Sequence, residues 1–188
     1  MTRAALLVID VQDAFNEQVA LDGAVRNNPE AETNIAALLA AARQAGWPVF
    51  HIHHASTEED SRFRPDRSGF SPQLFARPLA GEAVIVKNVN SAFIGTTLEA
   101  DLRKAAITRL VICGATTNHC VETSTRMAGN LGFDVELVED ACWAFDRTGM
   151  DGTRQKAEDI HNMSLNNLHR EFADIRRTKE LLGAFQAT

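Results

Sequence analysis

Short apolar runs alternate along the chain with longer segments of helical periodicity. The first run, residues 4–9, is apolar throughout, as expected for a strand that is covered on both faces. Further strands are predicted at residues 49–52, 83–86, 110–113, 133–138 and 172–175. Helices are predicted at residues 29–45, 96–105, 118–131 and 153–170, with a short helix after the last strand. This alternation predicts right-handed βαβ units and a parallel sheet with helices on both faces.

One segment departs from the alternation. Residues 56–81 are polar, contain several Arg, Ser and Pro residues, and show no sustained period. A connection of this length inside a compact domain is usually a lid or a binding loop. The segment is therefore a candidate lid, with Phe70 and Phe75 as the side chains that would close over a ligand.

Composition and charge narrow the classes of protein to consider. The 188 residues are 45% hydrophobic and 23% charged, which is typical of one globular domain, here residues 1–188. The net charge of −6 with interspersed acids and bases argues against a nucleic-acid or anionic-membrane partner. No apolar run approaches the ~18 residues of a membrane span, and no signal-peptide pattern is present. Three cysteines without a C-x-x-C motif fit a cytoplasmic protein.

The candidate chemistry lies where three of the predicted strands end. Asp10 follows the first strand, Lys87 follows the third, and Cys120 comes shortly after the fourth, near the start of a helix. Ligands of open parallel sheets bind beyond the carboxyl ends of the strands. We therefore expect an acid, an amine and a thiol to meet at one edge of the sheet.

These three side chains could form a nucleophilic site. A helix N-terminus and a nearby ammonium can lower a thiol pKa to ~3.5–7.5, and Lys87 would supply that ammonium. Asp10 could take the thiol proton and later pass it to a leaving amine. Each residue also has an ordinary interpretation, as a turn aspartate, a solvated lysine and a packing cysteine. Spacing alone does not decide between the two interpretations.

Three motifs resemble the isochorismatase-like cysteine hydrolase family. They are residues 7–12 (LVIDVQ), Lys87 followed by residues 90–93 (NSAF), and residues 114–121 (GATTNHCV). The family includes nicotinamidases, N-carbamoylsarcosine and maleamate amidohydrolases, and streptothricin hydrolase. The resemblance covers essentially the whole chain and implies a three-layer α/β/α sandwich around a six-stranded, mostly parallel, Rossmann-like sheet. It also implies a homo-oligomer, a dimer or larger.

The resemblance further implies roles for the residues at the sheet edge. Cys120 corresponds to the nucleophile, Asp10 to the general base and then acid, and Lys87 to their electrostatic partner. A cis peptide would join Ala115 and Thr116, and the N–H groups of Thr116 and Cys120 would form the oxyanion hole. The implied reaction is cleavage of an amide, carbamoyl or lactam C–N bond of a small molecule through a thioester.

The resemblance leaves other functions to exclude. True isochorismatases split a vinyl ether without a cysteine nucleophile, so Cys120 favours an amidase over that alternative. A catalytically retired, small-molecule-binding member is a further alternative, and the three filled triad positions argue against it. A nucleotide-binding Rossmann protein is disfavoured because the chain lacks both G-x-G-x-x-G after its first strand and G-x-x-x-x-G-K-[ST].

No metal or other cofactor is expected. Nicotinamidases of the family bind zinc through an Asp-x-His pair and a later His, but residues 50–56 (FHIHHAS) contain no aspartate. His51 and His53 would point to one face of a strand and residue 52 to the other, whereas zinc needs convergent ligands. We expect His51, His53 and His54 to be neutral and hydrogen-bonded near the site.

Substrate contacts are predicted from position alone. The candidates next to the triad residues are Phe15, Asn90, Phe93, Asn118 and His119. Trp143 and Phe145 are expected either to line the pocket or to pack at a subunit interface. Cys113, inside a strand, and Cys142, on a loop, are expected to be packing residues.

Overall fold

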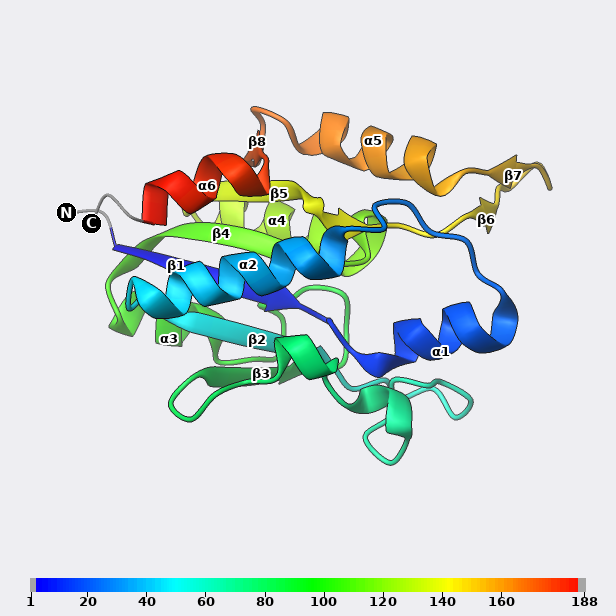
Figure 1. Ribbon diagram of the computed structural model, residues 1–188, viewed down its shortest axis with the longest axis horizontal. Helices are drawn as coiled ribbons and strands as arrows, with labels where there is room; N and C mark the ends of the chain where they lie inside the picture. Colours follow the sequence, from blue (N-terminus) through cyan, green and yellow to red (C-terminus); the bar gives the residue numbers. More distant parts are fainter. Residues whose placement is uncertain (1–2, 186–188) are drawn as a thin grey trace.

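The computed structural model describes residues 3–185, and its centre is a six-stranded parallel sheet (Figure 1). The strands are ordered β3-β2-β1-β4-β5-β8. Their bounds are β1 Arg3–Ile9, β2 Val49–His54, β3 Ala83–Lys87, β4 Ile107–Ala115, β5 Asp134–Trp143 and β8 Asp174–Arg176. All neighbouring pairs are parallel. The sequence prediction of a six-stranded α/β sheet is confirmed.

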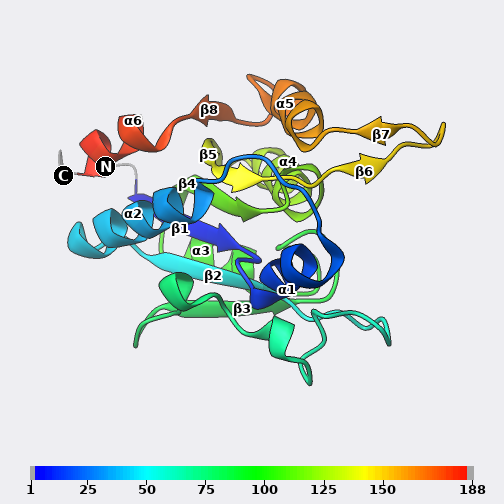
Figure 2. The same ribbon diagram turned by 45° about the vertical axis from the view of Figure 1, so that its right-hand side comes forward.

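Helices cover both faces of the sheet and complete a three-layer sandwich (Figures 1 and 2). On one face α2 packs against α6 and the central strands, and on the other face α3 and α4 pack on β4 and β5, with α5 beside α4. The helices are α1 Asp13–Asp22, α2 Ala31–Gln44, α3 Leu98–Lys104, α4 Glu122–Asn130, α5 Ala157–Leu168 and α6 Thr178–Phe185. No helix in this part of the chain is long and apolar enough to cross a membrane.

Burial explains why β1 and α2 are the clearest elements of the sequence. Residues 4–9 of β1 are all buried because β2 and β4 flank the strand and helices cover both of its faces. In α2 the apolar side chains recur on one helical face, which packs on the sheet. The buried residues of that helix are Ala31, Ile35, Leu38, Leu39 and Ala42.

Three elements differ from the prediction. The helix α1 was not expected, because only Ala14 and Phe15 of its residues are buried and its polar sequence shows little periodicity. The short ribbon of β6 (Arg147–Thr148) and β7 (Arg154–Gln155) is exposed and carries no apolar pattern. Strand β5 continues beyond residue 138, so Cys142 is buried within a strand and not on a loop.

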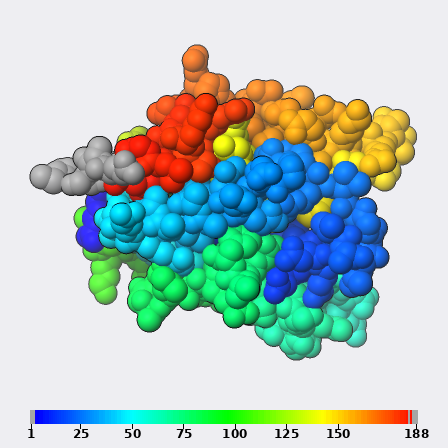
Figure 3. Space-filling view, in the orientation of Figure 1, coloured from blue at the N-terminus to red at the C-terminus, as the bar shows by residue number. Residues whose placement is uncertain are grey.

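The carboxyl ends of the strands share one end of the molecule with the irregular segments. In the space-filling view α1 and residues 56–81 lie against each other at that end (Figure 3). Within residues 56–81 the chain forms two short 3₁₀ turns, η1 (Ser68–Phe70) and η2 (Leu74–Ala76).

A close approach of β1 and β4 brings their ends together. Gly114 has φ +123°, and a Cβ atom there would lie 2.1 Å from the carbonyl oxygen of Ile9. Only glycine combines this backbone conformation with such a contact. Asp10 and the turn after β4 are therefore held side by side.

Candidate active site

Three of the predicted residues meet at the carboxyl edge of the sheet. Asp10 follows β1, Lys87 is the last residue of β3, and Cys120 lies in η3 (Thr117–Val121), a single π-helical turn between β4 and α4. The Lys87 ammonium donates to Asp10 Oδ2 at 2.7 Å and to Cys120 Sγ at 3.3 Å. Its side chain is 0% exposed. The predicted acid, amine and thiol are thus in mutual contact.

His54 is a fourth member of this cluster; the sequence prediction placed it near the site but did not predict its contact with Lys87. The ammonium of Lys87 lies 3.2 Å from His54 Nδ1. An ammonium has three protons and no acceptor, so Asp10, Cys120 and His54 together satisfy it and leave the His54 proton on Nε2. Strand β2 runs to residue 54, two residues further than predicted, and this extension carries His54 to the sheet edge.

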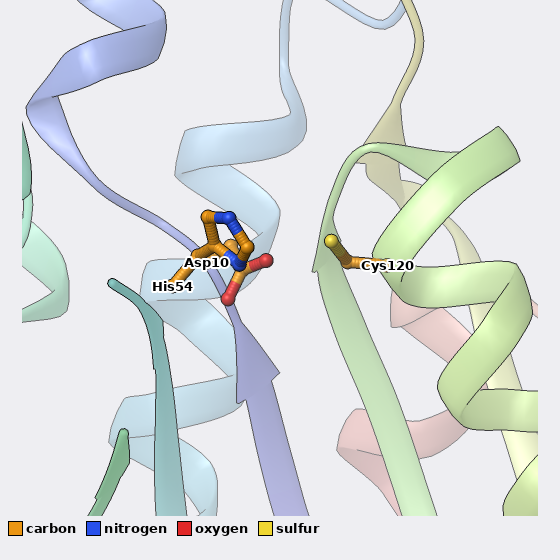
Figure 4. A group of neighbouring side chains, drawn as sticks. All are labelled: Asp10, His54 and Cys120. Carbon is orange, nitrogen blue, oxygen red and sulfur yellow. The ribbon is translucent and has the colours of Figure 1, made fainter. Parts of the chain in front are cut away.

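The two oxygens of the Asp10 carboxylate have different surroundings. Oδ2 accepts from Lys87, while Oδ1 is buried without a hydrogen-bond partner among residues 3–185. One carboxylate oxygen points toward the Cys120 sulfur (Figure 4). Asp10 also has φ +52°, an uncommon conformation that aspartate tolerates and that concentrates at functional sites. Its free oxygen is placed to accept a proton.

The thiol of Cys120 differs from the expectation of a lowered pKa. Burial, and after it the negative charge of Asp10, raise the pKa of Cys120 to about 12 against the opposing effect of Lys87. The sequence prediction considered Lys87 and the helix start, which lower a thiol pKa, but not burial and Asp10, which raise it. The resting pair is therefore a thiol beside a carboxylate, and the proton must leave as the sulfur attacks.

The segment before Cys120 has the expected unusual backbone. The peptide bond between Ala115 and Thr116 is cis. The Thr116 carbonyl accepts from the N–H groups of His119 at 3.1 Å and Val121 at 3.3 Å. Thr116 and Cys120 both line the adjacent cavity, and their role as an oxyanion hole stays a prediction.

A cavity of about 520 Å³ opens beside these residues. Its apolar wall is made by Phe15, Phe63 and Phe145, with ring centroids of Phe15 at 4.9 Å from Phe63 and 5.8 Å from Phe145. Of the predicted contacts, the cavity is lined by Phe15, Asn90, Asn118 and His119. Asn90 Oδ1 is 3.8 Å from Cys120 Sγ.

Two aromatic predictions need correction. Phe93 does not line the cavity but stacks on Phe133 with centroids 6.2 Å apart, because its side chain turns toward the core. Residues 56–81 reach the cavity through Ser56, Glu58, Ser61 and Phe63, not through Phe70 or Phe75. Phe70 lies edge-on to His53, and Phe75 packs against the core. Whether the segment closes as a lid stays a prediction.

The residues after β5 also contribute to the cavity. Phe145, Asp146 and Arg147 line it, whereas Trp143 is fully buried behind Phe15. The sequence prediction named Phe145 as an alternative and missed Asp146 and Arg147. No periodic signal marks the β6–β7 ribbon, so its approach to the cavity could not be inferred.

The histidines of β2 do not form a metal site together. His51 Nε2 pairs with Glu82 at 2.8 Å, and burial lowers the pKa of both His51 and His53. Within residues 3–185, three potential metal donors gather at Asp10, His54 and Cys120. The Lys87 ammonium lies between these three donors, so they do not fit a metal ion in this arrangement.

Comparisons with known proteins identify the family of the chain. The isochorismatase domain model matches residues 4–180. The isochorismatase family protein YrdC of Bacillus subtilis (strain 168) is 45% identical over 99% of this chain and 98% of its own. A crystal structure assigned to the isochorismatase family, from Chromobacterium violaceum, shares 42% identity with a TM-score of 0.94, covering 99% of this chain and 95% of its own.

A further relative is named for an enzymatic activity. Ureidoacrylate amidohydrolase RutB of Variovorax paradoxus (strain S110) is 30% identical over 73% of this chain and 68% of its own. The match to the domain model and the identity to YrdC extend over nearly the entire chain. The chain is therefore a hydrolase of the isochorismatase family, which includes enzymes that cleave amide C–N bonds.

Proposed function

We propose that the protein hydrolyses an amide, carbamoyl or lactam C–N bond of a small molecule, with Cys120 as the nucleophile. The observation that carries the proposal is the Lys87 ammonium, which contacts Cys120 Sγ and Asp10 Oδ2 while Asp10 Oδ1 stays free. This arrangement supplies a nucleophile, a proton acceptor and a fixed positive charge beside a cavity of small-molecule size.

The proposed reaction begins with proton transfer. Asp10 takes the proton of Cys120 as the sulfur attacks the carbonyl carbon, and Lys87 stabilises the developing thiolate. The N–H groups of Thr116 and Cys120 would donate to the oxyanion. When the C–N bond breaks, Asp10 returns the proton to the leaving amine. A water molecule then attacks the thioester, with Asp10 as base, and the thiol is restored.

Two alternative functions fit the contacts around Lys87 less well. A vinyl-ether hydrolase of the isochorismatase type has no use for a thiol in contact with a carboxylate and an ammonium. A retired family member has no use for a buried lysine in contact with a thiol, because burying a charge is costly unless it is paired. The contacts around Lys87 favour the amidase over both alternatives.

The test is product release from a panel of primary amides, carbamoyl compounds and lactams. Ammonia is measured for the first two classes, and ring opening is followed for lactams. Turnover that disappears in Cys120→Ala but persists in Cys113→Ala, a buried cysteine of β4, would support the proposal. Turnover that survives in Cys120→Ala would refute it.

We further propose that the protein forms one domain over residues 1–188 and assembles as a homo-oligomer. The cysteines of the described chain are free thiols, and Cys113 and Cys142 are buried. Free thiols of this kind favour a reducing compartment such as the cytoplasm. Size-exclusion chromatography with light scattering would give the oligomeric state.

A further inference from the structure

Arg147 lies in β6 at the mouth of the cavity and is a cation without an acidic partner. Its side chain lines the cavity, and no carboxylate of residues 3–185 forms an ion pair with it. Its one side-chain hydrogen bond in this part of the chain joins Nη1 to His119 Nε2 at 3.0 Å. A guanidinium has five N–H donors, so most of its binding capacity is unused.

Two acidic residues that line the cavity, Asp10 and Asp146, have partners of their own. Asp10 is neutralised by Lys87, and Asp146 accepts from Arg154 and from the Ala157 N–H. Within residues 3–185, Glu58 is the other charged lining residue without an ion-pair partner, and its charge acts on His54. Glu122, whose charge acts on His119, is paired with Arg126. Among the described residues that line the cavity, Arg147 is therefore the cation available to an anionic ligand.

A hydrogen-bonded chain fixes Arg147 relative to the reacting residues. Arg147 can only donate, so His119 Nε2 is the acceptor and the His119 proton resides on Nδ1. Nδ1 lies 3.1 Å from Thr116 Oγ1, to which it donates. Burial and the charge of Arg147 lower the pKa of His119, which agrees with a neutral ring. Arg147 is thereby linked to the residues on both sides of the proposed oxyanion hole.

We propose that Arg147 binds a carboxylate of the substrate, so that the preferred substrates are small amides or carbamoyl compounds carrying an acid group. The substrate class rests on the function proposed above, whereas the anion-binding role of Arg147 does not. Arginine binds carboxylates through two parallel N–H···O bonds. Because His119 adjoins Cys120, an anion held there lies close to the scissile carbonyl group.

A first experiment needs no substrate. Iodoacetate and iodoacetamide both alkylate a thiol with loss of iodide, but only iodoacetate is negatively charged. Cys113 and Cys142 are 0% exposed, so the folded protein should react at Cys120, which peptide mass spectrometry verifies. In Arg147→Gln the ratio of the iodoacetate rate to the iodoacetamide rate should fall about tenfold, as expected for loss of one charge-assisted hydrogen bond.

A matched variant controls for net charge. Lys104→Gln removes one positive charge at the end of α3, before β4 begins and so at the opposite edge of the sheet. Its ratio should stay close to that of the wild type. Arg147→Lys should give an intermediate ratio, since it keeps the charge without the planar fork. A ratio that is unchanged in Arg147→Gln, or that falls equally in Lys104→Gln, would overturn the proposal.

A second experiment tests the substrate class. Succinamate is compared with pentanamide, and N-carbamoylglycine with propylurea, as acidic and neutral compounds of similar size. The wild type should favour the acidic member of each pair in kcat/KM, and Arg147→Gln should lose about tenfold or more of that preference. Equal kcat/KM values in the wild type, or a preference that survives in Arg147→Gln, would overturn the acidic class while leaving the amidase intact. If none of the four is hydrolysed, the acidic substrate class is refuted for such compounds, and the alkylation ratio still decides the role of Arg147.

Discussion

The floor and the rim of the cavity are held in place in different ways. The floor consists of Asp10, His54, Lys87 and Cys120. The rim consists of Glu58, Phe63 and Arg147. The floor residues lie at strand ends or in the turn after β4, and Lys87 and Asp10 have side chains only 0% and 2% exposed. The rim residues lie in irregular segments or in the short β6–β7 ribbon, and Glu58 and Arg147 are exposed.

This difference separates two tasks. The sheet fixes the floor, whose residues contact one another and would perform the chemistry. Among the rim residues, Phe63 contacts the floor directly, with its ring centroid 5.7 Å from that of His54, whereas Arg147 contacts His119, the neighbour of Cys120 in the chain. Changes to the floor should therefore alter kcat and stability, whereas changes to the rim should alter the choice and affinity of the substrate.

Asp10→Asn should have the largest effect on turnover. Loss of the proton acceptor should lower kcat by about 10³- to 10⁴-fold. The same change removes the negative charge that raises the Cys120 pKa, so alkylation by iodoacetamide should become faster. Asp13→Asn, at the start of α1, is the matched control and should change neither rate. A parallel fall in turnover and alkylation would instead indicate structural damage to the floor.

The rate of Cys120 alkylation should change with pH almost as much as kcat changes in Asp10→Asn. Only the thiolate reacts, and with a pKa of about 12 for Cys120 its population is small at neutral pH. The alkylation rate should rise about tenfold per unit over roughly pH 7 to 10, by about 10³-fold in all. A plateau below about pH 8 would show that the thiol is already ionised there and that Lys87 outweighs burial.

Lys87→Met should mainly lower stability. It leaves the Asp10 carboxylate buried and unpaired, which should lower the free energy of unfolding by about 3–5 kcal/mol in urea denaturation. Adding Asp10→Asn in the same chain removes the uncompensated charge and should recover part of the loss. If the single and double variants are equally unstable, packing and not charge accounts for the effect.

Phe63→Ala, a change at the rim, should have the smallest effect on catalysis. Loss of this apolar wall should raise KM about three- to tenfold with kcat nearly unchanged, because the lost contact is the same in the ground and transition states. Leu74→Ala changes a side chain that is 76% exposed in the same segment and should have no effect. A large fall in kcat for Phe63→Ala would break the separation between rim and floor.

The same separation explains what could be predicted from the sequence. Asp10, Lys87 and Cys120 were identifiable because continuous apolar strands precede Asp10 and Lys87, a strand and one turn precede Cys120, and parallel strands deliver their ends to one edge. His54 was expected near the site, but its contact with Lys87 was not predicted, because the carboxyl end of β2 is polar and the apolar pattern stops before the strand does.

The rim and the thiol required tertiary information. Arg147 belongs to a two-residue strand without any period. Phe93 follows Lys87 in the chain, like Asn90, yet packs against Phe133. The direction of the Cys120 pKa depends on burial and on a charge from β1, neither of which local sequence reports.

For protein engineering, the contact at Gly114 separates what can be varied from what cannot. The approach of β4 to Ile9 is made by backbone atoms, so no side-chain library can tune the spacing between Asp10 and the Cys120 turn. Mutagenesis at Gly114 would yield mostly unfolded clones, whereas libraries at Glu58, Phe63 and Arg147 sample exposed or half-buried positions. Directed evolution of this scaffold can therefore diversify its substrate range while its reactive centre is inherited unchanged.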